Sequence, residues 1–228
     1  MKKFELTTES ITNVAGKKLF RIKALVEFGD VKAGELGGYV EKEENVSQDG
    51  NAWVSDTAEV SGNAWVSGNA RVHSNARAFD NARVSGNAEV SGNAEMSGNA
   101  RVSGNAWVCD TARVSGNAWV CGNVGVRDTA RVSGNAEVSG NAEMRDDARV
   151  SNNADYALVQ GFGTKFRCTT FYRGKNKKIM VNCGCFHGDL EEFRKQVKET
   201  RSGKIAKEYL MIADLMEYHF ASEDSDDE

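Results

Sequence analysis

The sequence predicts a mainly β protein whose central part is a parallel β-helix. A six-residue unit, A-x-V-S-G-N, repeats from about Asp49 to Asp155, and of the eighteen positions of one frame from Ala52 to Ala154 all are alanine except Val124. Short repeats in a fixed frame are typical of solenoids, in which each unit packs only against its neighbours. The chain has 23 glycines and no proline, which fits glycine in a repeated turn better than in a flexible linker.

The alternation of side chains along a strand decides which residues of the unit face inward. In A-x-V the Ala and Val point to one side and x points to the other, whereas a helix cannot keep a six-residue pattern on one face. The remaining S-G-N is predicted to form a corner, because Gly and Asn tolerate a positive φ. Asp replaces Gly at Asp56, Asp110 and Asp128, where we expect it to form local hydrogen bonds that favour a turn.

This repeat resembles that of the left-handed parallel β-helix family, whose motif is an aliphatic residue followed four positions later by a small one, repeated every six residues. The resemblance covers residues 49–155. It implies a left-handed winding, a triangular cross-section and three hexapeptides in each coil. Eighteen units then give about six coils.

With three units in a coil, the outward side chains stack in three columns. The first column contains Trp53, Arg71, Glu89, Trp107, Gly125 and Glu143. The second contains Glu59, Arg77, Glu95, Arg113, Arg131 and Arg149. The third contains Trp65, Arg83, Arg101, Trp119, Glu137 and Asp155. The second column begins with alternating charges and is predicted to be a solvated face.

All four tryptophans of the chain stand in the first and third columns. An outward indole is costly unless another surface covers it, and Trp with Arg is a typical pair at interfaces. We therefore predict a binding surface formed by Trp53, Trp65, Trp107, Trp119, Arg71, Arg83 and Arg101. The alternative is that each indole lies flat on the neighbouring rungs. Many proteins of the resembled family are trimers packed through such faces, which implies a homotrimer.

Both ends of the β-helix are expected to be capped, because open strand edges promote aggregation. Residues 1–48 are the predicted N-terminal β cap; Val40 and Val46 stand in frame with the later alanines, so the first coil is expected to begin near Leu36.

Residues 156–221 are the predicted C-terminal α+β cap. We expect a hairpin of strands Lys165–Tyr172 and Lys178–Cys183. A helix then starts at Asp189, with Glu192 at capping-box spacing, and a second helix follows. Residues 222–228, SEDSDDE, are predicted to be a disordered acidic tail.

The complete arrangement resembles a family of phage and prophage hexapeptide-repeat proteins. The resemblance rests on LGGYVE before the coils and on GFG, TTF and VNCGCF after them. It implies a bacterial-virus context, but it supplies neither a reaction nor functional residues.

The fold is best known from acyltransferases, which need a histidine general base. The only histidine in the coils is His73, at a corner with no evident acidic partner, so we interpret it as a surface substitution. No catalytic residue and no cofactor is therefore predicted.

A zinc site formed by Cys168, Cys183, Cys185 and His187 is the next candidate. The spacing is not a standard one, and small buried thiols are the favoured interpretation, so no metal is predicted. Cys109 and Cys121 are predicted to lie on different sides of the tube, without the partner of a nucleophile.

Charge and hydropathy restrict the class of function. The 29 basic and 33 acidic residues give a net charge of −4, which argues against general nucleic-acid binding. No apolar stretch is long enough to span a membrane, and no apolar segment follows the N-terminal lysines as in a secretory signal. With five cysteines expected to be reduced, we expect a cytoplasmic location in a bacterial host cell.

These observations favour a non-enzymatic phage-type binding protein that acts through the Trp/Arg faces of an oligomeric β-helix. A host defence protein or a nucleotide-like immune signal is the expected partner, on the strength of the viral context. An acyltransferase working between subunits and a structural or scaffold protein are the alternatives.

Overall fold

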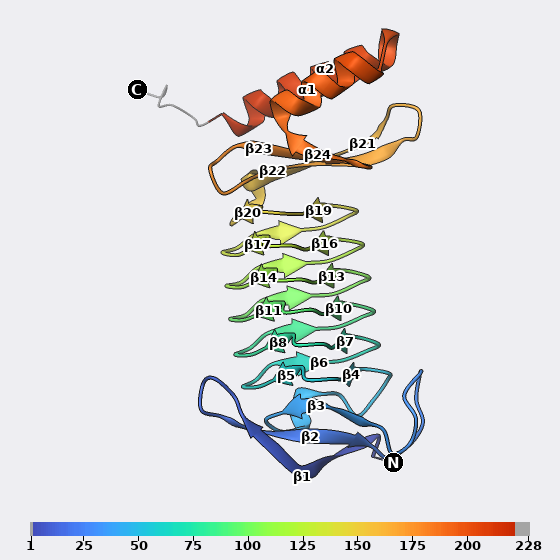
Figure 1. Ribbon diagram of the computed structural model, residues 1–228, viewed down its shortest axis with the longest axis vertical. Helices are drawn as coiled ribbons and strands as arrows, with labels where there is room; N and C mark the ends of the chain where they lie inside the picture. The colour runs from blue at the N-terminus through green and yellow to red at the C-terminus, as the bar shows by residue number, and fades with distance from the viewer. Residues whose placement is uncertain (1, 222–228) are drawn as a thin grey trace.

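The computed structural model describes residues 2–221 and shows a rod in which a solenoid is closed by a cap at each end (Figure 1). The solenoid consists of two-residue strands on three faces. The first face holds β4 (Trp53–Val54), β7 (Arg71–Val72), β10 (Glu89–Val90), β13 (Trp107–Val108), β16 (Gly125–Val126) and β19 (Glu143–Met144). The second holds β5 (Glu59–Val60), β8 (Arg77–Ala78), β11 (Glu95–Met96), β14 (Arg113–Val114), β17 (Arg131–Val132) and β20 (Arg149–Val150). The third holds β6 (Trp65–Val66), β9 (Arg83–Val84), β12 (Arg101–Val102), β15 (Trp119–Val120) and β18 (Glu137–Val138).

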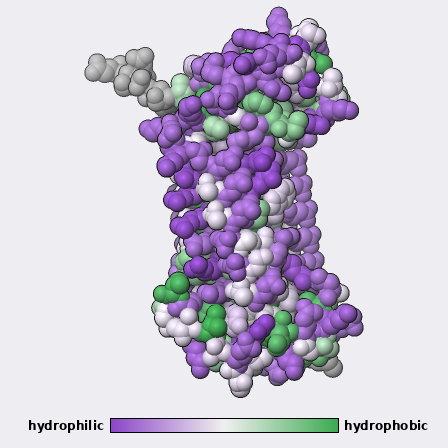
Figure 2. Space-filling model, viewed as in Figure 1, coloured by the Kyte–Doolittle hydropathy of each residue, from purple (hydrophilic) through white to green (hydrophobic). Residues whose placement is uncertain are grey.

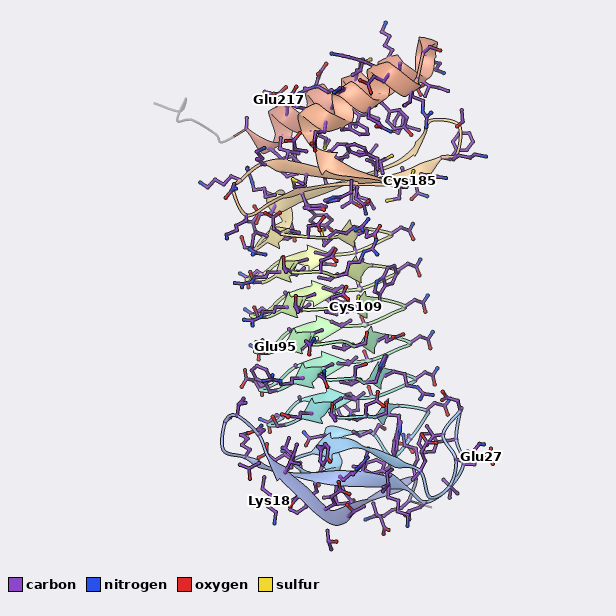
Figure 3. All side chains as sticks on the ribbon, in the orientation of Figure 1. Lys18, Glu27, Glu95, Cys109, Cys185 and Glu217 are labelled. Carbon is purple, nitrogen blue, oxygen red and sulfur yellow. The ribbon has the colours of Figure 1, made fainter. Side chains whose placement is uncertain are left out.

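The lumen of the solenoid is filled by the small and aliphatic positions of the repeat. From Ala52 to Val150, every Ala and Val of these positions is at most 1% exposed, and Met96 and Met144 are fully buried. Ala154, the last small position, lies in a 3-10 helix and is exposed. The residue between the small and the aliphatic position of each unit points outward, and Figure 3 shows side chains such as Glu95 on the outside of the coils. The predicted tube with an alanine and valine lining is confirmed.

Neighbouring coils pair in parallel, each residue with the one 18 positions later in the chain, as in Asn69 with Asn87. The backbone N–H groups donate to the following coil; Trp53 donates to the Ala70 carbonyl oxygen at 3.1 Å. The predicted three-unit coil is confirmed. The third column is one rung shorter than predicted, because Asp155 lies in the 3-10 helix η2 (Asn153–Asp155) and is buried.

The corners follow the predicted use of glycine but not of asparagine. Glycines such as Gly86 have a positive φ, whereas the asparagines of the corners do not. Their side-chain amides instead form ladders along the rod; the Asn69 Nδ2 donates to the Asn87 Oδ1 at 2.9 Å, and Asn87 to Asn105 at 2.9 Å. The role predicted for Asn was wrong, because the exact superposition of identical amides in successive coils offers each one a partner.

The corner aspartates do adopt a positive φ, 61° at Asp80. Their hydrogen bonds are not the local ones expected from the sequence. The Asp80 Oδ2 accepts from the Gly98 N–H at 3.0 Å, and the Asp56 Oδ2 accepts from the Ser74 N–H at 2.9 Å, both one coil further on. The carboxylate therefore satisfies a corner N–H of the next coil.

The N-terminal cap is built from β1 (Phe4–Thr12), β2 (Lys18–Ala24), β3 (Leu36–Val40) and the 3-10 helix η1 (Glu43–Asn45). β1 and β2 are antiparallel, and β3 joins the second face through β5. The first coil thus begins at Leu36, as predicted. Val40 and Val46, however, pair with Val60 and Val66, and so they occupy the valine position of the repeat and not the alanine position.

Specific side chains satisfy the backbone groups that the terminal coils leave open. At the first coil, the Lys3 Nζ donates to the Ala52 carbonyl at 2.9 Å, and the Asn45 Nδ2 donates to the Ala64 carbonyl at 2.8 Å. At the last coil, Asn153 Oδ1 accepts from the Glu137 N–H at 2.8 Å. Because all ladder N–H groups point one way, the first end needs donors and the last end needs acceptors.

The C-terminal cap is a four-stranded antiparallel sheet covered by two helices (Figure 1). Its elements are β21 (Tyr156–Phe162), β22 (Arg167–Arg173), β23 (Ile179–Cys183), β24 (Phe186–Asp189), α1 (Leu190–Thr200) and α2 (Gly203–Phe220). The predicted hairpin is confirmed as β22 and β23, but the outer strands were missed. Asp189 caps α1 as predicted, accepting from the Glu192 N–H at 3.0 Å. The predicted acidic tail, residues 222–228, lies outside the described residues.

Hydrophobic side chains reach the surface mainly at the two ends of the rod, and the coils between them show a mostly hydrophilic surface in Figure 2. Within residues 2–221 no helix is both long and apolar enough to cross a membrane.

Candidate functional site

The third face carries the largest part of the predicted Trp/Arg surface. Trp65, Arg83, Arg101 and Trp119 follow one another on successive coils, and each indole is 42% exposed. The Trp119 Nε1 donates to the Ser103 hydroxyl at 3.1 Å, which fixes this ring against the neighbouring coil. In this column two arginines stand between two tryptophans, and Glu137 follows Trp119 on the last rung of the face.

The two arginines of this column keep unpaired charges within residues 2–221. The ion pairs of the coils involve other arginines; Arg77 and Arg113, for example, flank Glu95 on the second face at 3.9 and 3.2 Å. The cation–π pairs of the described residues involve Phe and Tyr rings and not these indoles. Arg83 and Arg101 are therefore available to an external partner.

The N-terminal cap contacts two predicted binding residues of the first face. Trp53 is only 1% exposed, because the rings of Phe4 and Phe28 from the N-terminal cap pack edge-on against it at 6.2 and 5.4 Å. Arg71 forms an ion pair with Asp30 of the same cap. The assignment of Trp53 to the binding surface was wrong, because the repeat pattern gives no information on which coil the N-terminal segment covers. Arg71 stays partly exposed, and its assignment remains a prediction.

Trp107, the remaining tryptophan of the first face, is 38% exposed and lies over the next rung. A Cβ at Gly125 would come within 2.5 Å of its Cζ2 atom. The alternative interpretation, an indole lying flat along its column, is therefore correct for this residue, although its outer side remains open.

His73 has the acidic neighbour that the sequence did not reveal. Its Nε2 lies 2.8 Å from the Glu89 Oε1, and its Nδ1 lies 3.1 Å from the Ser74 hydroxyl. The expectation of a corner histidine without an acidic partner was wrong, because Glu89 stands on the next coil, 16 residues away. Both side chains are on the outside of the rod at the corner between the first and second faces.

The cysteines differ in their surroundings. Burial raises the pKa of the Cys109 thiol to about 11, and burial also raises the pKa of Cys121. Cys168 and Cys183 are partly exposed, and Cys185 is exposed, so the interpretation of small buried thiols was wrong.

His187 does not face these thiols. Its Nε2 meets the Tyr172 hydroxyl at 2.9 Å and its Nδ1 meets Asp146 at 2.9 Å. Among residues 2–221, no group of three or more His, Cys, Asp or Glu side chains is arranged to hold a metal ion.

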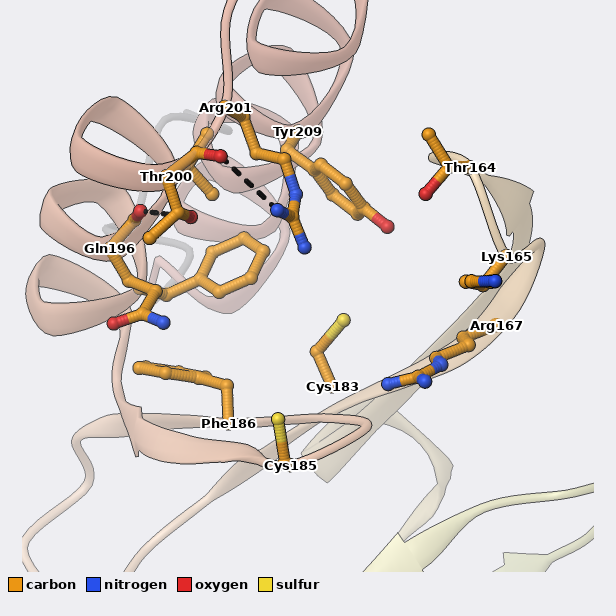
Figure 4. Close-up of a pocket in the computed structure, with 12 residues that line it drawn as sticks. Thr164, Lys165, Arg167, Cys183, Cys185, Phe186, Gln196, Thr200, Arg201 and Tyr209 are labelled. Carbon is orange, nitrogen blue, oxygen red and sulfur yellow. Dashed lines mark hydrogen bonds between the residues drawn. The ribbon is translucent and has the colours of Figure 1, made fainter.

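A pocket of about 440 Å³ lies in the C-terminal cap, between the sheet and the two helices (Figure 4). The end of β23 contributes Cys183, the turn before β24 contributes Cys185, and α1 contributes Phe193 and Gln196. Tyr209 of α2 closes the opposite side.

Three basic residues line this pocket, and each comes from a different segment. Lys165 stands in the loop between β21 and β22, Arg167 begins β22, and Arg201 lies between the two helices. Among residues 2–221, no carboxylate belongs to the lining. The Arg201 Nη1 donates to the Thr200 carbonyl at 3.1 Å, so the last turn of α1 holds this guanidinium in place.

Tyr209 joins α2 to the rim of the pocket. Its hydroxyl donates to the Phe162 carbonyl at 3.3 Å, and its ring meets Phe193 edge-on at 5.8 Å. Burial raises the pKa of this hydroxyl, with a contribution from the neighbouring Cys183. Gly163 and Gly184 make room for the lining, because a Cβ at either position would collide with Tyr209 or Arg167.

Sequence reasoning missed this pocket. The CGC segment was noticed only as part of a family resemblance and as a candidate metal site, and the three cations are spread over residues 165–201. The one available signal was the presence of basic residues on both sides of the CGC turn. Only the packing of the helices on the sheet brings them together.

A family profile described as the YdcK β-solenoid repeat matches residues 96–110. No curated protein matches the chain. The matched residues lie about halfway along the solenoid, and the match agrees with the parallel pairing of strands on all three faces. The chain is a β-solenoid repeat protein.

Proposed function

We propose that this protein is a non-enzymatic binding protein that works as a parallel homotrimer, held together by the first and third faces of its solenoid. The two faces share an edge of the prism, since each third-face strand is followed in the chain by a first-face strand. When three copies are arranged around a three-fold axis that runs along this edge, the first face of each solenoid lies beside the third face of the next copy.

The shared edge is the corner best suited to lie at a three-fold axis. The residue with a positive φ at this corner is glycine in every coil, at Gly68, Gly86, Gly104, Gly122 and Gly140. The corner between the first and second faces carries aspartates, among them Asp56 and Asp110, and the corner between the second and third faces carries Asp80. An uncharged edge avoids the repulsion of like charges brought close together by symmetry.

The single observation that carries the proposal is the match of residues at equal heights on the two faces. Trp107 and Trp119 belong to the same coil, and Glu89 and Arg101 belong to the coil before it. In a parallel trimer, Trp107 of one copy meets Trp119 of the neighbouring copy at the height of their shared coil. At the height of the preceding coil, Glu89 of one copy meets the unpaired Arg101 of the neighbour. Burial of aromatic side chains supplies most of the energy of such an interface.

The second face then remains outside the assembly. Glu95 of this column pairs with Arg77 and Arg113, as expected of a solvated surface. The trimer presents three C-terminal caps at one end, where a host partner is able to bind. A role against host defence is the proposal that follows from the phage resemblance.

The test is a charge exchange between the two faces, followed by native mass spectrometry and light scattering. Arg101→Glu and Glu89→Arg are each expected to weaken the trimer by roughly tenfold or more, because each places like charges opposite one another. The double variant is expected to restore it. Arg113→Glu, on the second face, serves as the control and should leave the mass unchanged.

Two tryptophan variants complete the test. Trp119→Ser and Trp107→Ser should each reduce trimer formation, with far-UV circular dichroism confirming that the coils remain folded. A monomeric wild-type chain, or a trimer insensitive to these faces, contradicts the proposal.

The acyltransferase alternative rests on His73 and its contact with Glu89. This histidine lies at the corner between the first and second faces, away from the edge proposed for the trimer axis. Acetyl-CoA binding that is lost in His73→Ala would favour the enzyme.

A further inference from the structure

We propose that the pocket in the C-terminal cap binds a small phosphorylated molecule that carries a flat aromatic group. This inference is independent of the proposed trimer, because every lining residue belongs to one chain.

The charge of the pocket selects an anion. Lys165, Arg167 and Arg201 line one cavity, to which no carboxylate of the described part of the chain contributes. The ion pairs of the cap are formed by other cations, such as Arg194 with Glu217 and Lys178 with Asp189, so within residues 2–221 these three have none. All three residues are exposed at this cavity, so their charges are accessible to an anion from solvent.

The type of cation favours phosphate over a single carboxylate. Two of the three are guanidinium groups, whose planar forks match the oxygens of a phosphate. A phosphate monoester carries a charge of about −1.5 to −2 near neutral pH. It therefore neutralises more of the local charge than one carboxylate does.

The floor of the pocket provides for a flat organic group. Phe186 and Phe193 lie side by side with ring centroids 5.5 Å apart, and Tyr209 stands edge-on to Phe193. Phe193 is buried while Phe186 is partly exposed, so part of this aromatic cluster is open to the cavity (Figure 4). A flat ring placed on it makes stacking or edge contacts while its phosphate reaches the basic rim.

The size and shape of the cavity agree with this ligand class. Its volume of about 440 Å³ lies within the range of small-molecule pockets, roughly 300 to 1,000 Å³. The Gln196 and Thr164 side chains add exposed polar groups at the margin. The Cys185 thiol is exposed at the same cavity, which makes it a chemical reporter of occupancy.

The experiment is calorimetric titration of the full-length protein with adenosine monophosphate, adenosine and inorganic phosphate at low salt. Adenosine monophosphate is expected to bind at least about tenfold more tightly than either fragment, because only the intact molecule uses both the rim and the floor. Its affinity should fall as salt is added, since the main attraction is between charges.

Arg167→Gln and Arg201→Gln together are expected to weaken binding by about tenfold or more. Arg131→Gln, an exposed arginine of the second face, is the matched control and should bind like the wild type. If the double variant does not fold, Lys165→Gln on the exposed loop replaces it, with an expected loss of several-fold.

Alkylation of Cys185 by iodoacetamide, followed by peptide mass spectrometry, gives a second measurement on the unmodified chain. Bound adenosine monophosphate should slow the labelling of Cys185 and leave that of Cys121, on the solenoid, unchanged. The proposal is overturned if adenosine monophosphate does not bind at millimolar concentration or binds no more tightly than adenosine. It is also overturned if Arg131→Gln weakens binding as much as the double variant does, or if the ligand does not slow the labelling of Cys185.

Discussion

The indole of Trp107 occupies the space that a side chain at Gly125 would need. A Cβ on Gly125 would lie 2.5 Å from Cζ2 and 2.7 Å from Cε2 of the ring. Gly125 is the one outward position of the coils without a side chain, and it follows directly above a tryptophan in its column. The two residues therefore form one unit, in which the missing side chain lets the ring lie flat.

Replacement of Gly125 by alanine should destabilise the wild-type protein by about 1 kcal/mol, because the indole must leave its place on the rung. In a Trp107→Ala background the same change should be neutral or stabilising by about 0.5 to 1 kcal/mol, because alanine is favoured over glycine inside a strand. Urea denaturation of the four proteins measures both effects. The same effect of Gly125→Ala in both backgrounds would disprove the coupling.

Asp80 combines a left-handed backbone with a hydrogen bond to the Gly98 N–H of the next coil. Asp80→Gly should cost about 1 kcal/mol through the lost bond, and Asp80→Ala should cost about 1 to 2 kcal/mol more because alanine disfavours a positive φ. Asp80→Asn, which retains an acceptor oxygen, should remain near the wild type. Thermal unfolding in a differential calorimeter ranks the three variants, and equal losses for Gly and Ala would exclude the role of backbone strain.

Asn87 lies inside an amide ladder and makes two side-chain bonds, one to Asn69 and one to Asn105. Asn87→Ala should lower the free energy of unfolding by roughly 1 to 2 kcal/mol. Asn135 ends a second ladder and receives one such bond, from Asn117 at 3.0 Å, so Asn135→Ala should cost about half as much. Denaturant titrations compare the two, and a smaller loss at Asn87 than at Asn135 would contradict the ladder.

Lys3 gives the protein a specific pH dependence. Burial lowers the pKa of this amine from 10.5 to about 8 in the folded chain, against the opposing effect of Asp49. Between these two pH values the unfolded chain holds more protons than the folded chain, so the Lys3 contribution to stability should rise as the pH increases from about 8 to 10.5.

The measurement is the free energy of unfolding of the wild type minus that of Lys3→Met, at about pH 7.5, 9 and 10. The difference should grow with pH, because the neutral amine keeps donating to the Ala52 carbonyl without the cost of a buried charge. A difference that shrinks over this range would show that the charged form is the one favoured by folding.

The central fold was predictable because its information is local and repeated. The A-x-V-S-G-N unit specified the lining of the tube, the outward columns and the glycine corners, all of which the structure confirms. The roles of Asn87 and Asp80 were not predictable in the same way, because their partners lie in another coil and the choice between local and inter-coil bonds depends on how the coils are stacked.

The candidate sites show the same division. The third-face column of Trp65 to Trp119 follows from the repeat, and the structure places its members on successive coils. The burial of Trp53 could not be foreseen, because Phe4 and Phe28 reach it from a segment without repeats.

The sequence by itself determined a β-solenoid with an alanine and valine interior, because a six-residue period forces the same environment on every unit. Only the tertiary structure decided which outward residues stay free and where a cationic pocket forms. The caps have no repeat, and their contacts join residues far apart in the chain, such as Tyr209 with Phe162. Such contacts depend on the packing of whole elements, which no local pattern of residues encodes.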